Sequence, residues 1–94
     1  MIKNLSVIIP TYNEEIHLER LLKQINSKVK NIYVIDSHSS DKTIGIAKKY
    51  NCKIYKKKFV NHSKQINYLL NKIKPQNHWI LRLDADEIIE DNFF

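Results

Sequence analysis

Residues 79–87 read WILRLDADE, an apolar run that ends abruptly in three carboxylates. A short apolar run that stops at polar residues is typical of a buried strand ending in a loop, so we expect a strand over residues 79–83. If the backbone stays extended beyond it, Asp84 and Asp86 point to the same side, because strand side chains repeat every two residues. Their charges repel each other at that separation, so a compensating group is expected nearby.

Three further apolar runs have the same form, and segments with the helical spacing of apolar residues lie between them. We expect strands over residues 5–9, 32–35, 53–55 and 79–83. We expect helices over residues 18–25, 43–50 and 66–73. Ser40 or Asp41 is expected to cap the second helix, and Asn61 or Ser63 the third.

This alternation of strands and helices predicts an α/β fold with a parallel sheet, right-handed crossovers and helices on both faces. The apolar character of the first, second and fourth strands is typical of strands covered on both faces. Ligands of such sheets bind at the carboxyl ends of the strands. Three loops that carry acidic residues should therefore gather along one edge, and we expect the functional site there: residues 10–14, 36–41 and 84–87.

The polar residues of these loops suggest particular chemistry. Asp84 and Asp86 supply hard oxygen ligands that suit Mg²⁺ or Mn²⁺, and a solvated turn is the alternative interpretation. Asp36, at the end of the second strand, could accept a hydrogen bond from a base or a ribose, or could cap the following turn. Tyr12 could stack on a base or pack over the edge of the sheet. Asp41 is equally explained as a helix cap.

Glycine and cysteine usage excludes several classes of site. Gly45 is the only glycine, so neither a G-x-G-x-x-G motif nor a P-loop can be built, and any diphosphate must be held mainly by a cation. Cys52 is the only cysteine, which excludes an intrachain disulfide or a cysteine-cluster zinc site and fits a reducing cytoplasm. The four histidines share no ligand spacing and are expected on the surface.

The net charge of +6 lies largely in a lysine-rich region between residues 42 and 58. Three interpretations stay open: a solvated face, an attraction to anionic lipid headgroups or a phosphate-bearing substrate, and nucleic-acid binding. The chain has only two arginines and no basic and aromatic surface pattern of the kind that stacks bases, so we expect no nucleic-acid partner. We expect a cytoplasmic protein with peripheral contact to the inner face of the cell membrane.

Three segments carry a resemblance to a known family. The stretches LSVIIPTYNEE (5–15), VIDSHSSDKT (34–43) and LRLDADE (81–87) resemble the N-terminal half of the family 2 glycosyltransferases, whose Rossmann-like nucleotide-binding fold is called GT-A. The resemblance covers essentially the whole chain. The spacing from Asp36 to Thr43 looks like a branch whose members add a sugar, often glucose, to the lipopolysaccharide inner core.

The resemblance implies a role for each motif residue. Thr11, Tyr12 and Glu14 would line the nucleoside pocket, and Asp36 would contact the base, commonly uracil. Asp84 would lie near the ribose and the water shell of the cation, while Asp86 would ligate Mn²⁺ or Mg²⁺. The implied donor is a nucleotide-sugar such as a UDP-sugar, the acceptor is a glycan or lipid-linked molecule, and the reaction inverts the anomeric centre.

Two departures from the family pattern stand out. Many relatives have Arg or Lys just before the asparagine that corresponds to Asn67, where this chain has Ile66, which the helical pattern assigns to the core. The phosphate contact would then be missing or supplied elsewhere, for example by Lys64. The second departure is length, because the acceptor-binding half and the general base would lie beyond Phe94.

From the length we expect residues 1–94 to be the donor-binding part of a longer domain, inactive by itself. The apolar tail residues Ile88, Ile89, Phe93 and Phe94 would pack on the other half or dock back, and the edge of the last strand could mediate self-association. The alternative is a truncated, non-catalytic module that binds nucleotide and metal. A receiver-like domain fits poorly, because the acids are spread over three strand ends.

Overall fold

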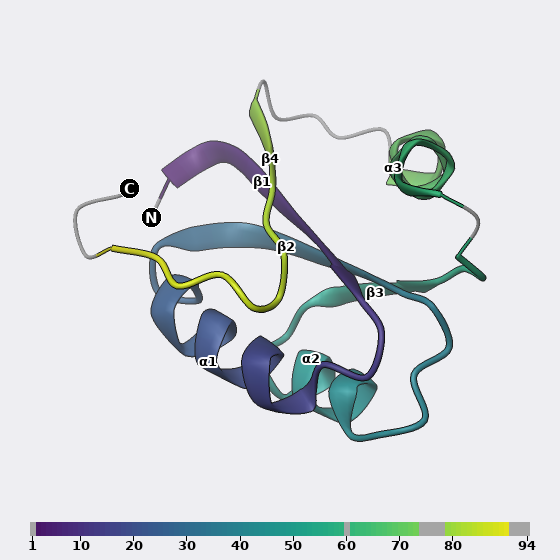
Figure 1. The fold of residues 1–94 in the computed structure, drawn as a ribbon. Coiled ribbons are helices and arrows are strands. Elements are labelled where there is room, and N and C mark those ends of the chain that lie inside the picture. Colours follow the sequence, from purple (N-terminus) through teal and green to yellow (C-terminus); the bar gives the residue numbers. More distant parts are fainter. Residues whose placement is uncertain (1, 60, 74–78, 91–94) are drawn as a thin grey trace.

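The computed structural model describes residues 2–59, 61–73 and 79–90. Strands and helices alternate along the chain as predicted (Figure 1). The elements are β1 (Ile2–Thr11), α1 (Glu15–Ile25), β2 (Val29–Asp36), α2 (Thr43–Lys49), β3 (Lys53–Lys56), α3 (His62–Ile73) and β4 (Trp79–Arg82). The first two strands and the first helix are longer than their apolar runs, because backbone pairing and helical bonding extend into the flanking polar residues.

All four strands run parallel in one sheet of order β3-β2-β1-β4. In the register of β1 and β2, Thr11 lies opposite Asp36. In turn, Asp36 lies opposite Lys56 of β3. Leu83 continues the pairing of β4 just past its end, since its amide donates to the carbonyl of Ile8 at 3.0 Å. The carboxyl ends of the strands therefore meet along one edge, as expected.

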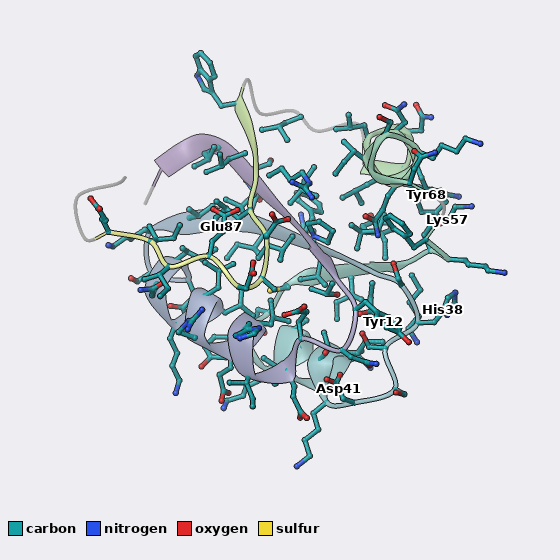
Figure 2. The ribbon with its side chains drawn as sticks, viewed as in Figure 1. Tyr12, His38, Asp41, Lys57, Tyr68 and Glu87 are labelled. Atoms are coloured by element: carbon teal, nitrogen blue, oxygen red, sulfur yellow. The ribbon has the colours of Figure 1, made fainter. Side chains whose placement is uncertain are left out.

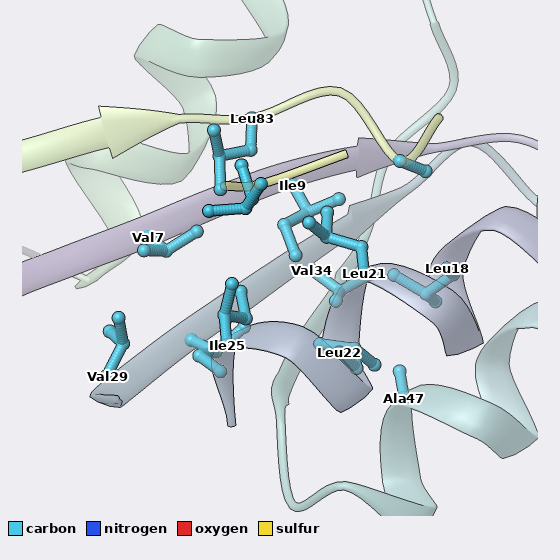
Figure 3. Packing of buried hydrophobic residues seen from close by; sticks show 13 residues of the cluster. Val7, Ile9, Leu18, Leu21, Leu22, Ile25, Val29, Val34, Ala47 and Leu83 are labelled. Carbon is cyan, nitrogen blue, oxygen red and sulfur yellow. The ribbon is translucent and has the colours of Figure 1, made fainter. Parts of the chain in front are cut away.

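Helices cover both faces of the sheet, which confirms the predicted layering. On one face α1 packs Leu18, Leu21, Leu22 and Ile25 against the sheet, and Ala47 of α2 joins the same cluster (Figure 3). On the other face a smaller cluster is formed by Leu69 of α3 with residues of β1 and β2: Ile8, Tyr33 and Ile35. Burial of these apolar side chains is the main stabilising contribution to the fold.

The prediction that the last strand is covered on both faces is wrong. Trp79 is 70% exposed and Ile80 is 44% exposed, whereas Leu83, just beyond the strand, is buried. Only β1 pairs with β4 among the described strands, and only one face of β4 packs against the main cluster. An apolar run reports the composition of a strand but not its place in the sheet, and β4 lies at one end of the four described strands.

The helix starts agree in part with the predicted caps. Asn61 precedes α3, and its side-chain oxygen accepts the Lys64 amide at 2.9 Å, as an N-cap does. The predicted N-cap of the second helix is wrong, because Lys42 occupies that position. Asp41, the residue before this N-cap, nevertheless accepts a hydrogen bond from the Thr43 amide at 2.9 Å. It therefore satisfies one of the free amides at the start of α2.

The segment after β4 docks back onto α1 through one of its apolar residues. Ile89 is buried in the main cluster, and its backbone exchanges two hydrogen bonds with the side chain of Gln24, at 3.1 and 3.3 Å. Ile88 is exposed. Phe93 and Phe94 lie outside the described residues. No helix in the described part of the chain is both long and apolar enough to cross a membrane.

Candidate functional site

A pocket of about 750 Å³ lies at the carboxyl edge of the sheet. This volume falls within the range of roughly 300–1,000 Å³ that is typical of small-molecule sites. Five of the six residues singled out in the sequence line it together: Thr11, Tyr12, Glu14, Asp84 and Asp86. They come from the ends of β1 and β4. In the sequence, Thr11 and Asp84 are 73 positions apart. Three loops were predicted to converge at this edge, and all three contribute to the pocket, because Ser37 of the loop 36–41 also lines it.

Asp36 is the sixth of these residues, and it does not line the pocket. Its side chain is fully buried. The Thr11 hydroxyl donates to Oδ1 at 2.7 Å, the Ser39 hydroxyl donates to the same oxygen at 2.6 Å, and the Ser39 amide donates to Oδ2 at 2.7 Å. Asp36 thus holds the end of β1 to the loop after β2. A contact between Asp36 and a base stays a prediction.

The loops after β1 and β2 are joined by a second set of bonds at Asn13. The backbone of Asn13 (φ 51°) and of His38 (φ 58°) is left-handed, a region in which Asn and His are enriched among non-glycine residues. The Asn13 amide donates to the Ser39 hydroxyl at 2.8 Å, and the Ser40 amide donates to the Asn13 side-chain oxygen at 2.8 Å. The chain turns sharply here without any glycine.

These bonds fix the neighbourhood of Tyr12. Figure 2 shows Tyr12, His38 and Asp41 gathered at the same end of the molecule. Tyr12 is 61% exposed and lines the pocket, so its side chain is not packed down on the sheet edge. Of the two roles that the sequence left open for Tyr12, this placement suits stacking on a ligand.

Asp41 ties the start of α2 to the start of α1. Its carboxylate accepts from the amide and the hydroxyl of Thr43 and from the amide of Glu15, and the Thr43 hydroxyl in turn accepts the amide of Glu14 at 2.9 Å. Burial acts to raise the pKa of Asp41, but these hydrogen bonds together outweigh it and leave the pKa below its usual value. The network positions Glu14 at the pocket.

The backbone after β4 is not extended through residues 84–86, which corrects the sequence-based expectation. The Glu87 amide donates to the carbonyl of Asp84 at 3.0 Å, and the Glu87 carboxylate accepts the Asp84 amide at 2.8 Å, so residues 84–87 form a turn. Ala85 is buried at the centre of this turn and anchors it to the core. The turn still leaves Asp84 and Asp86 both lining the pocket.

The charge of this acidic turn is compensated in part by arginines. Arg82 forms an ion pair with Asp84 at 2.9 Å. Arg20 donates to the backbone carbonyl of Asp86 at 2.9 Å. The carboxylate of Asp86 is exposed, with no hydrogen-bond or ionic partner among residues 2–59, 61–73 and 79–90.

The donor set fits a hard divalent cation. No group of three or more His, Cys, Asp or Glu side chains in the described chain is arranged to hold a metal ion. Two carboxylates at the pocket match Mg²⁺ and similar ions, which commonly take one or two carboxylates and complete their coordination with water and substrate phosphates. Asp84 and Asp86 could therefore hold Mn²⁺ or Mg²⁺ if water or ligand oxygens complete the coordination.

Five further residues line the pocket without an individual role predicted from the sequence, although Ser37 belongs to the expected loop 36–41 and Lys58 to the lysine-rich region: Ser37, Lys58, Phe59, Gln65 and Arg82. The rule that selected the other loops could have found Lys58 and Phe59, because they follow the third strand on the same edge. Gln65 belongs to α3. It is buried and donates to the Ser37 hydroxyl at 3.1 Å.

Other sequence-based expectations concern residues away from the pocket. Ile66 packs against the cluster around Ile8, as its helical position predicted. Lys64 is exposed and does not line the main pocket. His17 is exposed on α1, and its Nδ1 lies 2.9 Å from Oε2 of Glu14. Burial raises the pKa of Cys52 to about 11, so its thiol is protonated and unreactive near neutral pH.

Several lysines of the basic region contact other side chains on the surface. Lys49 pairs with Glu19 at 2.9 Å. Lys57 lies over the ring of Tyr68 with 5.2 Å between its nitrogen and the ring centre, and both are labelled in Figure 2. Such contacts are typical of a solvated face, which was the simplest of the three interpretations.

Comparison with known sequences places this arrangement in a family. The sequence profile of glycosyl transferase family 2 matches residues 6–94. An uncharacterized glycosyltransferase of Rickettsia bellii is 34% identical over 85 residues, covering 90% of this chain and 28% of that protein. One of Mycoplasma genitalium is 36% identical over 99 aligned positions, covering 89% of this chain and 32% of that protein. The chain thus spans less than a third of the length of these relatives.

Solved structures share the fold at low sequence identity. Glucosyl-3-phosphoglycerate synthase from Mycobacterium tuberculosis, in complex with Mn²⁺, UDP and glucosyl-3-phosphoglycerate, has a TM-score of 0.76 and 20% identity, covering 92% of this chain and 34% of that chain. The mannosyltransferase PcManGT from Pyrobaculum calidifontis, in complex with GDP-Man and Mn²⁺, has a TM-score of 0.76 and 21% identity, covering 92% of this chain and 28% of that chain.

These structural likenesses establish the GT-A, Rossmann-like fold that the sequence predicted, and the profile match extends over nearly the whole chain. The chain belongs to glycosyl transferase family 2.

Proposed function

We propose that the pocket binds a nucleotide-sugar together with a divalent cation, and that residues 1–94 form the donor-binding part of an inverting glycosyltransferase. The observation that carries the proposal is the single pocket into which the ends of β1 and β4 bring Thr11, Tyr12, Glu14, Asp84 and Asp86. Family membership supports the reaction class, because it makes a sugar nucleotide the natural ligand for a pocket of this size and position.

Each residue has a role that its surroundings support. The exposed ring of Tyr12 stacks on the base, while Thr11 and Glu14 line the nucleoside part of the pocket. Asp84 and Asp86 hold the cation, which when bound supplies Lewis-acid stabilisation of the departing nucleoside diphosphate. Asp36 keeps Thr11 in place through their hydrogen bond of 2.7 Å.

The finer identity of the substrates is also a proposal. The resemblance to lipopolysaccharide-core transferases favours a UDP-sugar donor and a cell-surface glycan or lipopolysaccharide acceptor. The solved neighbours leave the base open, since one was solved with UDP and another with GDP-Man. The acceptor site and the general base are expected outside the pocket residues named here.

The proposal is tested by calorimetric titration of the protein with UDP and with GDP, each with and without Mn²⁺. We expect Mn²⁺-dependent binding that Asp86→Asn weakens by on the order of tenfold or more, because a charged ligand to the cation is lost. Glu90→Gln is the matched control, since it removes one exposed carboxylate outside the pocket and should bind as the parent does. Absence of binding by any nucleoside diphosphate in the presence of Mn²⁺ would refute the proposal.

A non-catalytic module that holds nucleotide and cation is the second candidate. It is favoured by the pocket lining, in which the only carboxylates among the described residues are the three already assigned to the nucleoside and the cation: Glu14, Asp84 and Asp86. Assays of UDP-sugar hydrolysis and of sugar transfer separate the two candidates. Turnover by residues 1–94 alone would exclude the binding-only function and show that the general base lies within this segment.

A further inference from the structure

Arg82 lines two neighbouring pockets, and none of the sequence motifs suggested a role for it. We propose that Arg82 exchanges partners during donor binding: it pairs with Asp84 in the cation-free protein and binds the diphosphate of the nucleotide-sugar once a cation has engaged Asp84. This inference rests on the proposed function, and it assigns to β4 the phosphate contact that the sequence of α3 lacks.

The placement of Arg82 follows from the alternation of side chains along β4. Leu81 and Leu83 pack against the main cluster on the α1 side of the sheet, so Arg82 between them faces the α3 side. There it lines the main pocket and also a neighbouring pocket of about 630 Å³. The neighbouring pocket is shared between Arg82 and Asp84 of the β4 end and Ser63, Ile66 and Asn67 of α3.

The charge balance of the main pocket favours a role for Arg82 in binding phosphate. Its described lining contains three carboxylates but only two cationic side chains, Lys58 and Arg82. A diphosphate would add further negative charge. Lys58 is an exposed lysine, and a flexible ammonium group imposes no fixed geometry. Arg82 is held at the pocket by its 2.9 Å contact with Asp84.

The chemistry of the guanidinium group permits the exchange. Its planar set of N–H donors matches a carboxylate and a phosphate equally well. While Arg82 is paired with Asp84, it competes with a cation for the same carboxylate. A cation held by Asp84 would neutralise that charge and weaken the ion pair with Arg82, so that the guanidinium could donate to phosphate oxygens instead.

The exchange predicts effects of opposite sign for one substitution. Removing the guanidinium should strengthen binding of Mn²⁺ alone, because a competitor for Asp84 is lost. The same change should weaken binding of UDP in the presence of Mn²⁺, because a phosphate contact is lost. A purely structural role, in which Arg82 only supports the turn at residues 84–87, would weaken both.

The experiment compares the parent protein with Arg82→Gln, Arg82→Lys and Lys64→Ala. Binding of Mn²⁺ alone is followed by electron paramagnetic resonance, and binding of UDP and of uridine at saturating Mn²⁺ by calorimetry. We expect Arg82→Gln to weaken UDP binding by about tenfold or more, as for loss of a charge-assisted hydrogen bond, and to leave uridine binding unchanged. The binding of Mn²⁺ alone should become measurably tighter.

The other variants sharpen the result. Arg82→Lys keeps the charge but loses the planar fork, so its UDP affinity should lie between those of the parent and Arg82→Gln. Lys64→Ala removes a cation of α3 that is outside the main pocket, and it should bind UDP as the parent does. Thermal melts of all variants confirm that each is folded before binding is compared.

Failure of this inference can be told apart from failure of the proposed function. If the parent binds UDP with Mn²⁺ and Arg82→Gln binds it equally well, the role of Arg82 is refuted and the donor site stands. Weaker binding of Mn²⁺ alone by Arg82→Gln would also refute the exchange. If the parent binds no nucleoside diphosphate, both the donor site and the inference fall.

Discussion

The two ends of the pocket are built differently. At the ends of β1 and β2, a fully buried carboxylate accepts three hydrogen bonds and a second set of bonds joins the loops through Asn13. At the end of β4, the carboxylate of Asp86 is exposed without a partner in the described chain, and Asp84 relies on the ion pair with Arg82.

The two ends of the pocket therefore differ in how far their polar groups are satisfied within the protein. A network whose polar groups are satisfied inside the protein holds its geometry before any ligand arrives, as specific recognition requires. An acidic turn with an exposed carboxylate depends on an added positive charge to compensate its repulsion. The polar groups at the β1 and β2 end are thus satisfied within the protein, whereas the acidic turn at the β4 end keeps an exposed carboxylate.

Substitution of Asp36 gives the strongest test of the difference between the two ends of the pocket. Asp36→Ala removes three hydrogen bonds to a buried carboxylate and leaves the Thr11 hydroxyl and the Ser39 amide without their partner, so we expect a loss of about 3 kcal/mol in the free energy of unfolding. Urea denaturation at neutral pH measures the loss. Glu90→Ala is the control and should lie within about 0.5 kcal/mol of the parent. Equal stability of Asp36→Ala and the control would show that the network is not structural.

A smaller effect is expected at Asn13. Asn13→Ala loses the acceptor for the Ser40 amide and places in the left-handed region a residue that tolerates it less well than Asn, which should cost about 1–2 kcal/mol. Asn13→Gly loses the same acceptor without the conformational strain, so it should be more stable than Asn13→Ala. Denaturation curves of the two variants measured together separate the strain from the hydrogen bond. The reverse order would contradict a left-handed Asn13.

The smallest effect is expected at the β4 end. Glu87→Gln keeps an oxygen that can accept the Asp84 amide and removes one charge from the turn, so stability should change by no more than about 0.5 kcal/mol. Thermal denaturation without ligand tests this expectation. A large loss of stability would mean that the turn is as tightly built as the loops of the other end, and the contrast between them would disappear.

The layered fold could be predicted from the sequence because it depends on the local order of apolar runs. The four runs and the three helical segments lie where the structure has strands and helices, and the loops expected at the sheet edge line one pocket. The exposure of Trp79 could not be predicted, because its neighbours across the sheet come from distant parts of the chain. Nor could the turn at residues 84–87, whose centre is set by the burial of Ala85 in the core.

Composition and spacing alone thus determined the alternating elements, the family motifs and the edge at which acids gather, since each is a property of short segments. Tertiary structure alone decided which acids are buried and which face the pocket. It buries Asp36 under hydrogen bonds from two loops, exposes Asp86, and brings Arg82 to the junction of two pockets. The physical reason is that burial and charge pairing depend on which segments meet in space, and those contacts form only when the sheet is assembled.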